Sequence, residues 1–259
     1  MNRMRRRQFG QNFLDYNMAK SIAHDIDFKP SDIVLEVGPG HGALSEHLLP
    51  QIAELHAVEI DKECVSVLQN KFDSPKLQLY NCDFMDFDLA GFIAKHPNLW
   101  IVGNLPYNVA TAILQKILPF LHQLQGGMVM TQLEVALRFC AEPHSKAYGS
   151  LSVMTKAYAQ KRQILRTIGP EHFSPRPRVQ SATFLLQSHK PVGYEEAFFE
   201  FVQKCFFHKR KQLTNSLAHF WPKPLVLEKL NSLNFPINIR AEQLTLQDFL
   251  KLYQIFSKL

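Results

Sequence analysis

The alternation of short apolar segments with amphipathic ones is the feature that most constrains the fold of this chain. The segment from Asp32 to Gly38 is short, apolar and rich in β-branched residues, and a glycine ends it. These properties predict a parallel strand that is buried on both faces. Further segments of this kind occupy 55–61, 76–83, 99–106 and 126–134, with helical patterns at 42–49, 62–70 and 111–121. Strand–helix alternation of this kind predicts an α/β protein with a doubly wound sheet.

The pattern changes in the second half of the chain. Beyond Arg138, the segments 163–169 and 181–187 are typical of two further strands, and we expect them to add to one edge of the sheet in antiparallel orientation. A polar stretch with Pro and Gly follows, and then a Phe-rich helical segment without strand candidates. We therefore predict a larger α/β domain at 1–189 and a small all-α domain at 190–259.

Composition and cysteine spacing exclude several classes of protein. No stretch reaches the roughly 18 apolar residues of a membrane span, and the start is basic and polar, unlike a secretory signal. The four cysteines form no CxxC pair, which indicates neither a zinc site nor a disulfide framework. We expect a cytoplasmic protein with reduced thiols, no membrane association and no metal.

Positive charge is concentrated at the two ends of the chain. Residues 1–7 hold four arginines and no acid, residues 8–189 hold 15 Lys or Arg against 17 Asp or Glu, and residues 190–259 hold 10 against 6. This division favours binding to a polyanion through the extremities, although basic surfaces are also common without a partner. The candidate phosphate contacts are Arg5, Arg6, Arg7, Lys209, Arg210 and Lys211.

The ends of the first three predicted strands carry residues suited to a nucleotide-like ligand. A glycine turn with Gly38 and Gly40 follows the first strand, and glycines let a ligand approach the main chain. Glu59 ends the second strand, at a spacing typical of an acid that accepts hydrogen bonds from ribose. Asp83 ends the third, where it could accept a bond from an adenine amine while Phe84 covers the ring. Taken singly, the turn could serve only helix packing and each acid could be a helix N-cap.

The sharpest motif ends the fourth strand: Asn104, Leu105, Pro106 and Tyr107. The lone pair of an aryl amine is delocalised, so acceptors on its N–H groups help to pyramidalise it and to aim it at an electrophile. Asn104 Oδ1 and a main-chain carbonyl would serve in that role, Pro106 would stiffen the loop, and Tyr107 would stack on the base. The alternative is an Asx turn with a buried tyrosine.

Together these motifs make the chain resemble the ribosomal RNA adenine N6,N6-dimethyltransferases, in particular their small-subunit branch. The segments that carry the resemblance are 9–14, 36–40, 58–61, 81–83, 103–108, 148–150 and 173–181. It implies a Rossmann-like methyltransferase domain with a small helical C-terminal domain, and S-adenosylmethionine as methyl donor. It also implies that the substrate is two adjacent adenosines near the 3′ end of small-subunit rRNA, within a pre-ribosomal 30S particle, and that the protein acts as a monomer in ribosome biogenesis.

The resemblance also assigns roles to residues. It places Asn12 and Leu14 against the methionine part of the cofactor, and it makes Phe173 a second aromatic wall opposite Tyr107. Two other features are interpreted as structural. His41 is expected to be a solvent-facing loop residue, and the core of the small domain is expected to contain Phe198, Phe199, Phe201, Phe206 and Phe207.

Three alternative functions remain open at this point. The first is the related large-subunit (23S) rRNA adenine methyltransferase of the antibiotic-resistance type, against which Leu105 and Asn108 favour the small-subunit branch. The second is a non-catalytic RNA-binding assembly factor on the same fold, and the third is a small-molecule methyltransferase. The intact Asn104–Tyr107 motif opposes the second, and the basic ends oppose the third.

Overall fold

The computed structural model describes residues 12–188, 193–209 and 211–258, and these divide into two compact units. The first unit contains the described residues up to Ala136 and those from Ala159 to Ser188. The second contains Leu137–Tyr158 and the described residues from Gly193 onwards. The units therefore separate near the predicted linker, but 137–158 groups with the C-terminal helices instead of with the predicted 1–189 domain.

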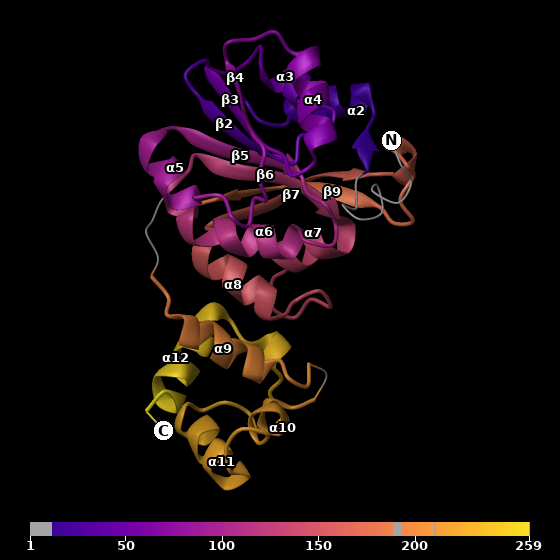
Figure 1. Cartoon of the computed structure of the whole chain (residues 1–259). Helices are drawn as coiled ribbons and strands as arrows, with labels where there is room; N and C mark the ends of the chain where they lie inside the picture. The colour runs from indigo at the N-terminus through magenta and orange to yellow at the C-terminus, as the bar shows by residue number, and fades with distance from the viewer. Residues whose placement is uncertain (1–11, 189–192, 210, 259) are drawn as a thin grey trace. The chain divides into compact units, whose positions relative to one another are not determined.

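Seven strands of the described chain form one mixed sheet in the first unit, in the order β4-β3-β2-β5-β6-β9-β7 (Figure 1). The first five are parallel to one another, and β9 pairs antiparallel with both β6 and β7. The predicted doubly wound sheet with an antiparallel addition at one edge is thereby confirmed. Their bounds are β2 (Ile33–Val37), β3 (Glu54–Val58), β4 (Leu77–Tyr80), β5 (Leu99–Asn104), β6 (Gly126–Gln132), β7 (Lys161–Ile168) and β9 (Ser181–Gln187).

The central strands are hydrophobic because both of their faces are covered. Every residue of β5 from Leu99 to Gly103 is buried, and so are Val34–Val37 of β2. Figure 1 shows α3 and α4 on one side of the sheet and α6 on the other. The helices of this unit are α2 (Tyr16–Ala23), α3 (Ser45–Leu48), α4 (Lys62–Lys71), α5 (Leu89–Lys95), α6 (Ala110–Ile117) and the start of α7 (Leu133–Cys140), with 3₁₀ turns η1 (Leu118–Gln123) and η2 (Pro170–His172).

Short polar side chains define where several helices begin. Asp15, Asp61 and Asp88 each accept a hydrogen bond from a backbone N–H in the first turn of the helix that follows. These bonds satisfy donors that have no partner within the helix. The helix predicted at 42–49 is shorter than expected, since residues before Ser45 form the turn that follows β2.

The second unit is helical, as predicted for the C-terminal residues. Its helices are α8 (Ser150–Tyr158), α9 (Glu196–Cys205), α10 (Leu213–Leu217), α11 (Lys223–Ser232) and α12 (Leu246–Phe256), with the 3₁₀ turn η3 (Ala241–Gln243). Tyr148 and Val153 are buried in the same apolar core as Phe198 and Phe249, and this packing explains why residues 137–158 belong here. Phe207 departs from the prediction, because its side chain is 50% exposed.

None of the described helices has both the length and the apolar character needed to cross a membrane.

Candidate active site

A cavity of about 490 Å³ opens in the first unit where the parallel strands end. In an open α/β sheet this edge is where ligands bind. The ends of β2, β3 and β5 and the turn after β4 all contribute to its lining. The predicted site residues that line it are Asn12, Leu14, Gly38, Gly40, Glu59, Asp83, Phe84, Asn104, Leu105, Pro106 and Tyr107.

The turn after β2 has the backbone that only glycine adopts readily. Gly38 has φ +68° and Gly40 has φ +58°, so both lie in the left-handed region. A Cβ on Gly40 would also lie 3.1 Å from the ring of Phe13. The glycines are therefore required by the turn itself, in addition to any ligand that approaches its backbone.

Glu59 holds this glycine turn to the end of β3. One of its carboxylate oxygens accepts a hydrogen bond from Gly40 N at 3.0 Å, and the other accepts one from Asp61 N at 2.9 Å. The side chain is buried, and burial raises the pKa of its carboxyl group although the backbone N–H donors act in the opposite direction. Each oxygen keeps a second lone pair, so the carboxylate can still accept bonds from a ligand's hydroxyls.

Glu36 also lines the cavity, although the sequence analysis assigns it no role. It precedes the glycine turn, is 1% exposed, and accepts a hydrogen bond from Ser45 Oγ at 2.6 Å. Burial raises the pKa of this carboxyl group to about 7, with the nearby Glu59 carboxylate adding to the effect. The signal that could have found it is a charged residue at the end of a strand whose other residues are all apolar.

The turn after β4 is fixed by a lysine from α6. Lys116 Nζ donates to the main-chain carbonyls of Phe84, Met85 and Phe87 at 2.8, 2.6 and 2.8 Å. It also lies 5.4 Å from the centre of the Phe84 ring, which is buried. Asp83 Oδ1 accepts from Met85 N at 2.8 Å within this turn, so Asp83 is not the helix N-cap of the alternative interpretation, and its Oδ2 is available to a ligand.

The motif that ends β5 is held at both of its ends. Asn104 Nδ2 donates to Asn12 O at 3.0 Å, so its Oδ1 is the atom left to accept from a ligand. At the other end, the Tyr107 hydroxyl and Ser181 Oγ of β9 are 2.6 Å apart. Burial raises the pKa of the Tyr107 hydroxyl, although the bond to Ser181 acts in the opposite direction. These contacts fix a partly exposed aromatic ring beside an amide oxygen.

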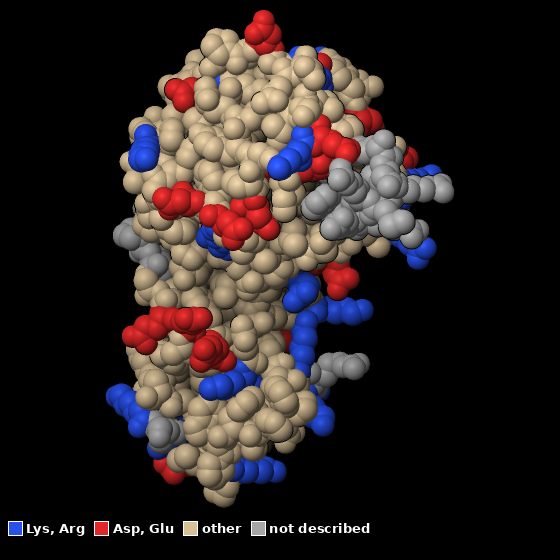
Figure 2. All heavy atoms as spheres, viewed as in Figure 1, with Lys and Arg blue, Asp and Glu red and all other residues tan. Residues whose placement is uncertain are grey.

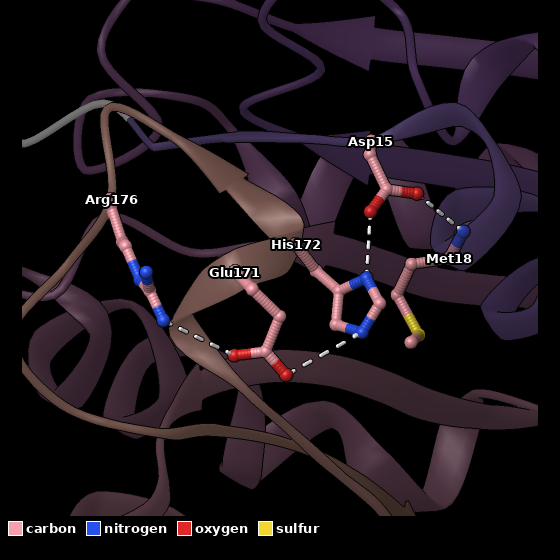
Figure 3. Close-up of polar contacts among 5 residues, drawn as sticks. All are labelled: Asp15, Met18, Glu171, His172 and Arg176. Atoms are coloured by element: carbon pink, nitrogen blue, oxygen red, sulfur yellow. Dashed lines mark hydrogen bonds and ion pairs between the residues drawn. The ribbon is translucent and has the colours of Figure 1, made fainter.

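The chain's first described strand closes one side of the cavity. β1 (Phe13–Leu14) pairs antiparallel with β8 (Phe173–Ser174). The pairing continues in side chains: Asp15 Oδ2 and His172 Nδ1 are 2.7 Å apart, and Asp15 N donates to His172 O (Figure 3). Figure 3 also shows Glu171 between His172 and Arg176, at ion-pair distances of 3.9 and 3.8 Å. This network fastens the Asn12–Leu14 segment from a distant part of the sequence.

Two sequence interpretations differ from the structure here. The ring of His41 stacks on Phe13 with centroids 4.0 Å apart and 10° between the planes, and it lines the cavity, so the prediction of a solvent-facing residue is wrong. Phe173 is only 6% exposed and packs in the core of the first unit instead of lining the cavity. Its position follows from the β1–β8 ladder, where it lies opposite Leu14.

Several of the candidate RNA contacts lie outside the part of the chain that the structure describes. Arg5, Arg6, Arg7 and Arg210 fall outside the described residues. In the second unit, Lys209 Nζ donates to Lys146 O at 2.9 Å, and Lys211 is exposed.

Comparisons with known proteins agree on one family. The model of the family "Ribosomal RNA adenine dimethylase" matches residues 2–258 of this chain. A protein of Nitrosospira multiformis named "Ribosomal RNA small subunit methyltransferase A" is 36% identical over 98% of this chain and 96% of its own length. A protein of the same name from Syntrophotalea carbinolica is 38% identical over 98% of both chains.

Solved structures show the same fold. The crystal structure of a dimethyladenosine transferase from Plasmodium falciparum superimposes with a TM-score of 0.76 at 23% identity, covering 96% of this chain and 98% of that one. The 23S rRNA methyltransferase ErmE gives a TM-score of 0.67 at 24% identity, with 94% and 98% covered. The predicted Rossmann-like methyltransferase fold is confirmed.

Proposed function

The chain belongs to the ribosomal RNA adenine dimethylase family, and from that premise we propose that it dimethylates N6 of two adjacent adenosines near the 3′ end of small-subunit rRNA. It is an enzyme that uses S-adenosylmethionine. The observation that carries the proposal is that the Asn104–Tyr107 motif and the acids Glu59 and Asp83 line one cavity. A methyl donor and a target amine can therefore meet there.

The donor set of the cavity fits the cofactor. Glu59 would accept hydrogen bonds from the ribose hydroxyls, and Asp83 Oδ2 would accept one from the adenine amine while Phe84 packs against the ring. Gly38 and Gly40 line the cavity and have no side chain that would block a ligand's approach to the main chain. When bound, S-adenosylmethionine supplies a methyl group on a positively charged sulfur.

At the target base, the chain's own groups would orient the amine. Asn104 Oδ1 accepts one N–H of the adenine amine and the main-chain carbonyl of Leu105 accepts the other, so the nitrogen lone pair turns toward the methyl donor. Pro106 stiffens the turn, and the Tyr107 ring, fixed by Ser181, stacks on the base. No strong base is needed, because the methylated ammonium loses its proton to solvent afterwards.

The names of the relatives support small-subunit rRNA as the substrate. The relatives from Nitrosospira multiformis and Syntrophotalea carbinolica are 36% and 38% identical to this chain over nearly their whole length, and both are named as small-subunit enzymes. These names favour a small-subunit substrate over the large-subunit alternative, and the likeness to ErmE supports only the fold. We infer that the substrate is presented within a pre-ribosomal 30S particle and that a monomer acts on it in the cytoplasm.

The proposed division of labour assigns RNA holding to the basic ends. Figure 2 shows Lys and Arg side chains along one edge of the second unit in this view. Replacing Lys209, Arg210 and Lys211 with Gln should weaken subunit binding and flatten its salt dependence, with roughly one unit of log–log slope lost per phosphate contact. Turnover at saturating subunit should stay unchanged. Filter binding at several salt concentrations tests this, and a variant that keeps the wild-type slope would contradict the assignment.

Primer extension tests the function directly, because a dimethylated N6 blocks Watson–Crick pairing and stops the copying enzyme. Small-subunit rRNA from cells that lack the protein should lose the stop at two adjacent adenosines near the 3′ end, and the wild-type gene should restore it. The Asn104→Ala variant is the matched control and should not restore it. The proposal would be overturned if the stop persisted in cells without the protein, or if a stop in 23S rRNA were lost instead. Methylation of free adenosine in an assay without RNA would also overturn it.

A further inference from the structure

Three potential metal ligands meet at the amino end of β3, away from the cavity. Glu54 begins this strand, His56 lies two residues later, and His96 is the C-cap residue of α5. Each offers one ligand atom, and these atoms all lie within 4.8 Å of one another. None of the three lines the cavity, since the cofactor residue Glu59 follows the opposite end of the strand.

The two imidazoles are already oriented by their other nitrogens. His96 Nδ1 lies 2.8 Å from Phe92 O, a contact in which Nδ1 carries the hydrogen and Nε2 keeps its lone pair. His56 Nδ1 lies 3.0 Å from the Tyr80 hydroxyl, which can accept a hydrogen in the same way. Bonds from the second ring nitrogen to a carbonyl or hydroxyl are the usual support of metal-bound histidines.

Burial and charge suit the cluster to a cation. His56 is 4% exposed, and this burial lowers the pKa of its ring. The nearby His96 also lowers this pKa, whereas the carboxylate of Glu54 raises it. A neutral imidazole is the form that binds metals. Glu54 is exposed and His96 is partly exposed, so an ion can enter from solvent.

We propose that Glu54, His56 and His96 bind one divalent transition-metal ion, with Zn²⁺ as the best match, and that this ion stabilises the first unit. Two imidazoles and one carboxylate form a donor set that Zn²⁺ accepts, with water completing the coordination. His56 Nε2 and Glu54 Oε2 are 3.0 Å apart, so an ion can replace the hydrogen that they share once His56 carries it on Nδ1. The site would link the end of α5 to β3.

Titration of the whole chain, first stripped with a chelator, tests the proposal. Co²⁺ should bind one per chain with a visible absorption band, and Zn²⁺ should displace it. Glu54→Gln and His96→Gln should each weaken binding at least tenfold, and Tyr80→Phe, which removes only the supporting hydroxyl, should weaken it by about tenfold. At the same Zn²⁺ concentration, the unfolding temperature should rise in the wild type and should rise less in the ligand variants.

His24→Gln is the matched control. His24 is likewise the C-cap residue of its helix, and its Nδ1 also lies 2.8 Å from the carbonyl four residues earlier, but it is not part of the cluster. This variant should bind metal like the wild type. Unchanged cofactor affinity in all variants would show that they fold. Absence of stoichiometric binding by the wild type would overturn the proposal, as would equal binding by the Glu54→Gln and His96→Gln variants.

Discussion

Glu36→Gln should change how the stability of the first unit depends on pH. The carboxyl group of Glu36 has its pKa raised from 4.5 to about 7 by burial, so the folded chain holds this proton more tightly than the unfolded chain does. Stability from this group is therefore fully present below about pH 4.5 and is lost as the pH rises through about 7. Glutamine resembles the protonated form and can still accept the bond from Ser45 Oγ.

The size of the effect follows from the same pKa. The difference between a pKa of 4.5 in the unfolded chain and about 7 in the folded chain corresponds to about 3 kcal/mol of unfolding free energy over the whole pH range. About 1 kcal/mol of this falls between about pH 6 and about pH 8. The wild type should lose that last amount between these two pH values, and Glu36→Gln should not. The difference in unfolding free energy between Glu36→Gln and the wild type should therefore shift by about 1 kcal/mol in favour of the variant between about pH 6 and about pH 8.

Urea unfolding monitored by tryptophan fluorescence measures this difference. Trp100 is buried in the first unit and Trp221 lies in the second, so a Trp221→Phe background makes the signal report on the first unit alone. Glu63→Gln removes an exposed acid from α4 and is the control, which should keep the wild-type dependence. If Glu36→Gln and the wild type lose the same stability between the two pH values, the argument from burial is refuted.

Three further predictions concern the cavity. Lys116→Met should weaken cofactor binding by about tenfold in calorimetry, because the turn that carries Phe84 loses three charge-assisted hydrogen bonds; unchanged affinity would dismiss its positioning role. Asn104→Ala should keep cofactor affinity within a few-fold but slow single-turnover methylation by ~10²–10³, and a rate near wild type would move the role elsewhere. Glu59→Ala should weaken cofactor binding more than Asp83→Ala, since Glu59 also holds Gly40; equal affinities of both variants and the wild type would reject the pocket.

Periodic, local signals in the sequence predicted much of the fold. The parallel strands could be predicted because the sheet is covered on both faces, so that residues such as Val34 and Ile101 are buried and the strands are continuous apolar runs. The strand ends then identified the residues that line the cavity. What could not be predicted depends on contacts between distant segments. The two-residue ladder of Leu14 with Phe173 has no period to detect, and it is this ladder that places Phe173 in the core.

The same limit applies to single side chains. The role of Lys116 depends on where α6 passes the turn after β4, and the meeting of His56 with His96 depends on how α5 returns to the sheet. The sequence shows these residues only as a cation on a helix and two isolated histidines. Residues 137–158 were likewise assigned to the wrong unit, because helical periodicity does not reveal which core a helix joins.

The fastening of β1 and Tyr107 has a consequence for synthesis of the chain. Among the described residues, those that line the cavity all lie at or before Ile113, whereas the partners that hold its walls, His172, Phe173 and Ser181, come much later. A nascent chain that has emerged only through β6 thus contains all the ligand-facing residues and none of these anchors. Cofactor binding should therefore be acquired in one late step of translation, when β8 and β9 leave the exit tunnel and close the site.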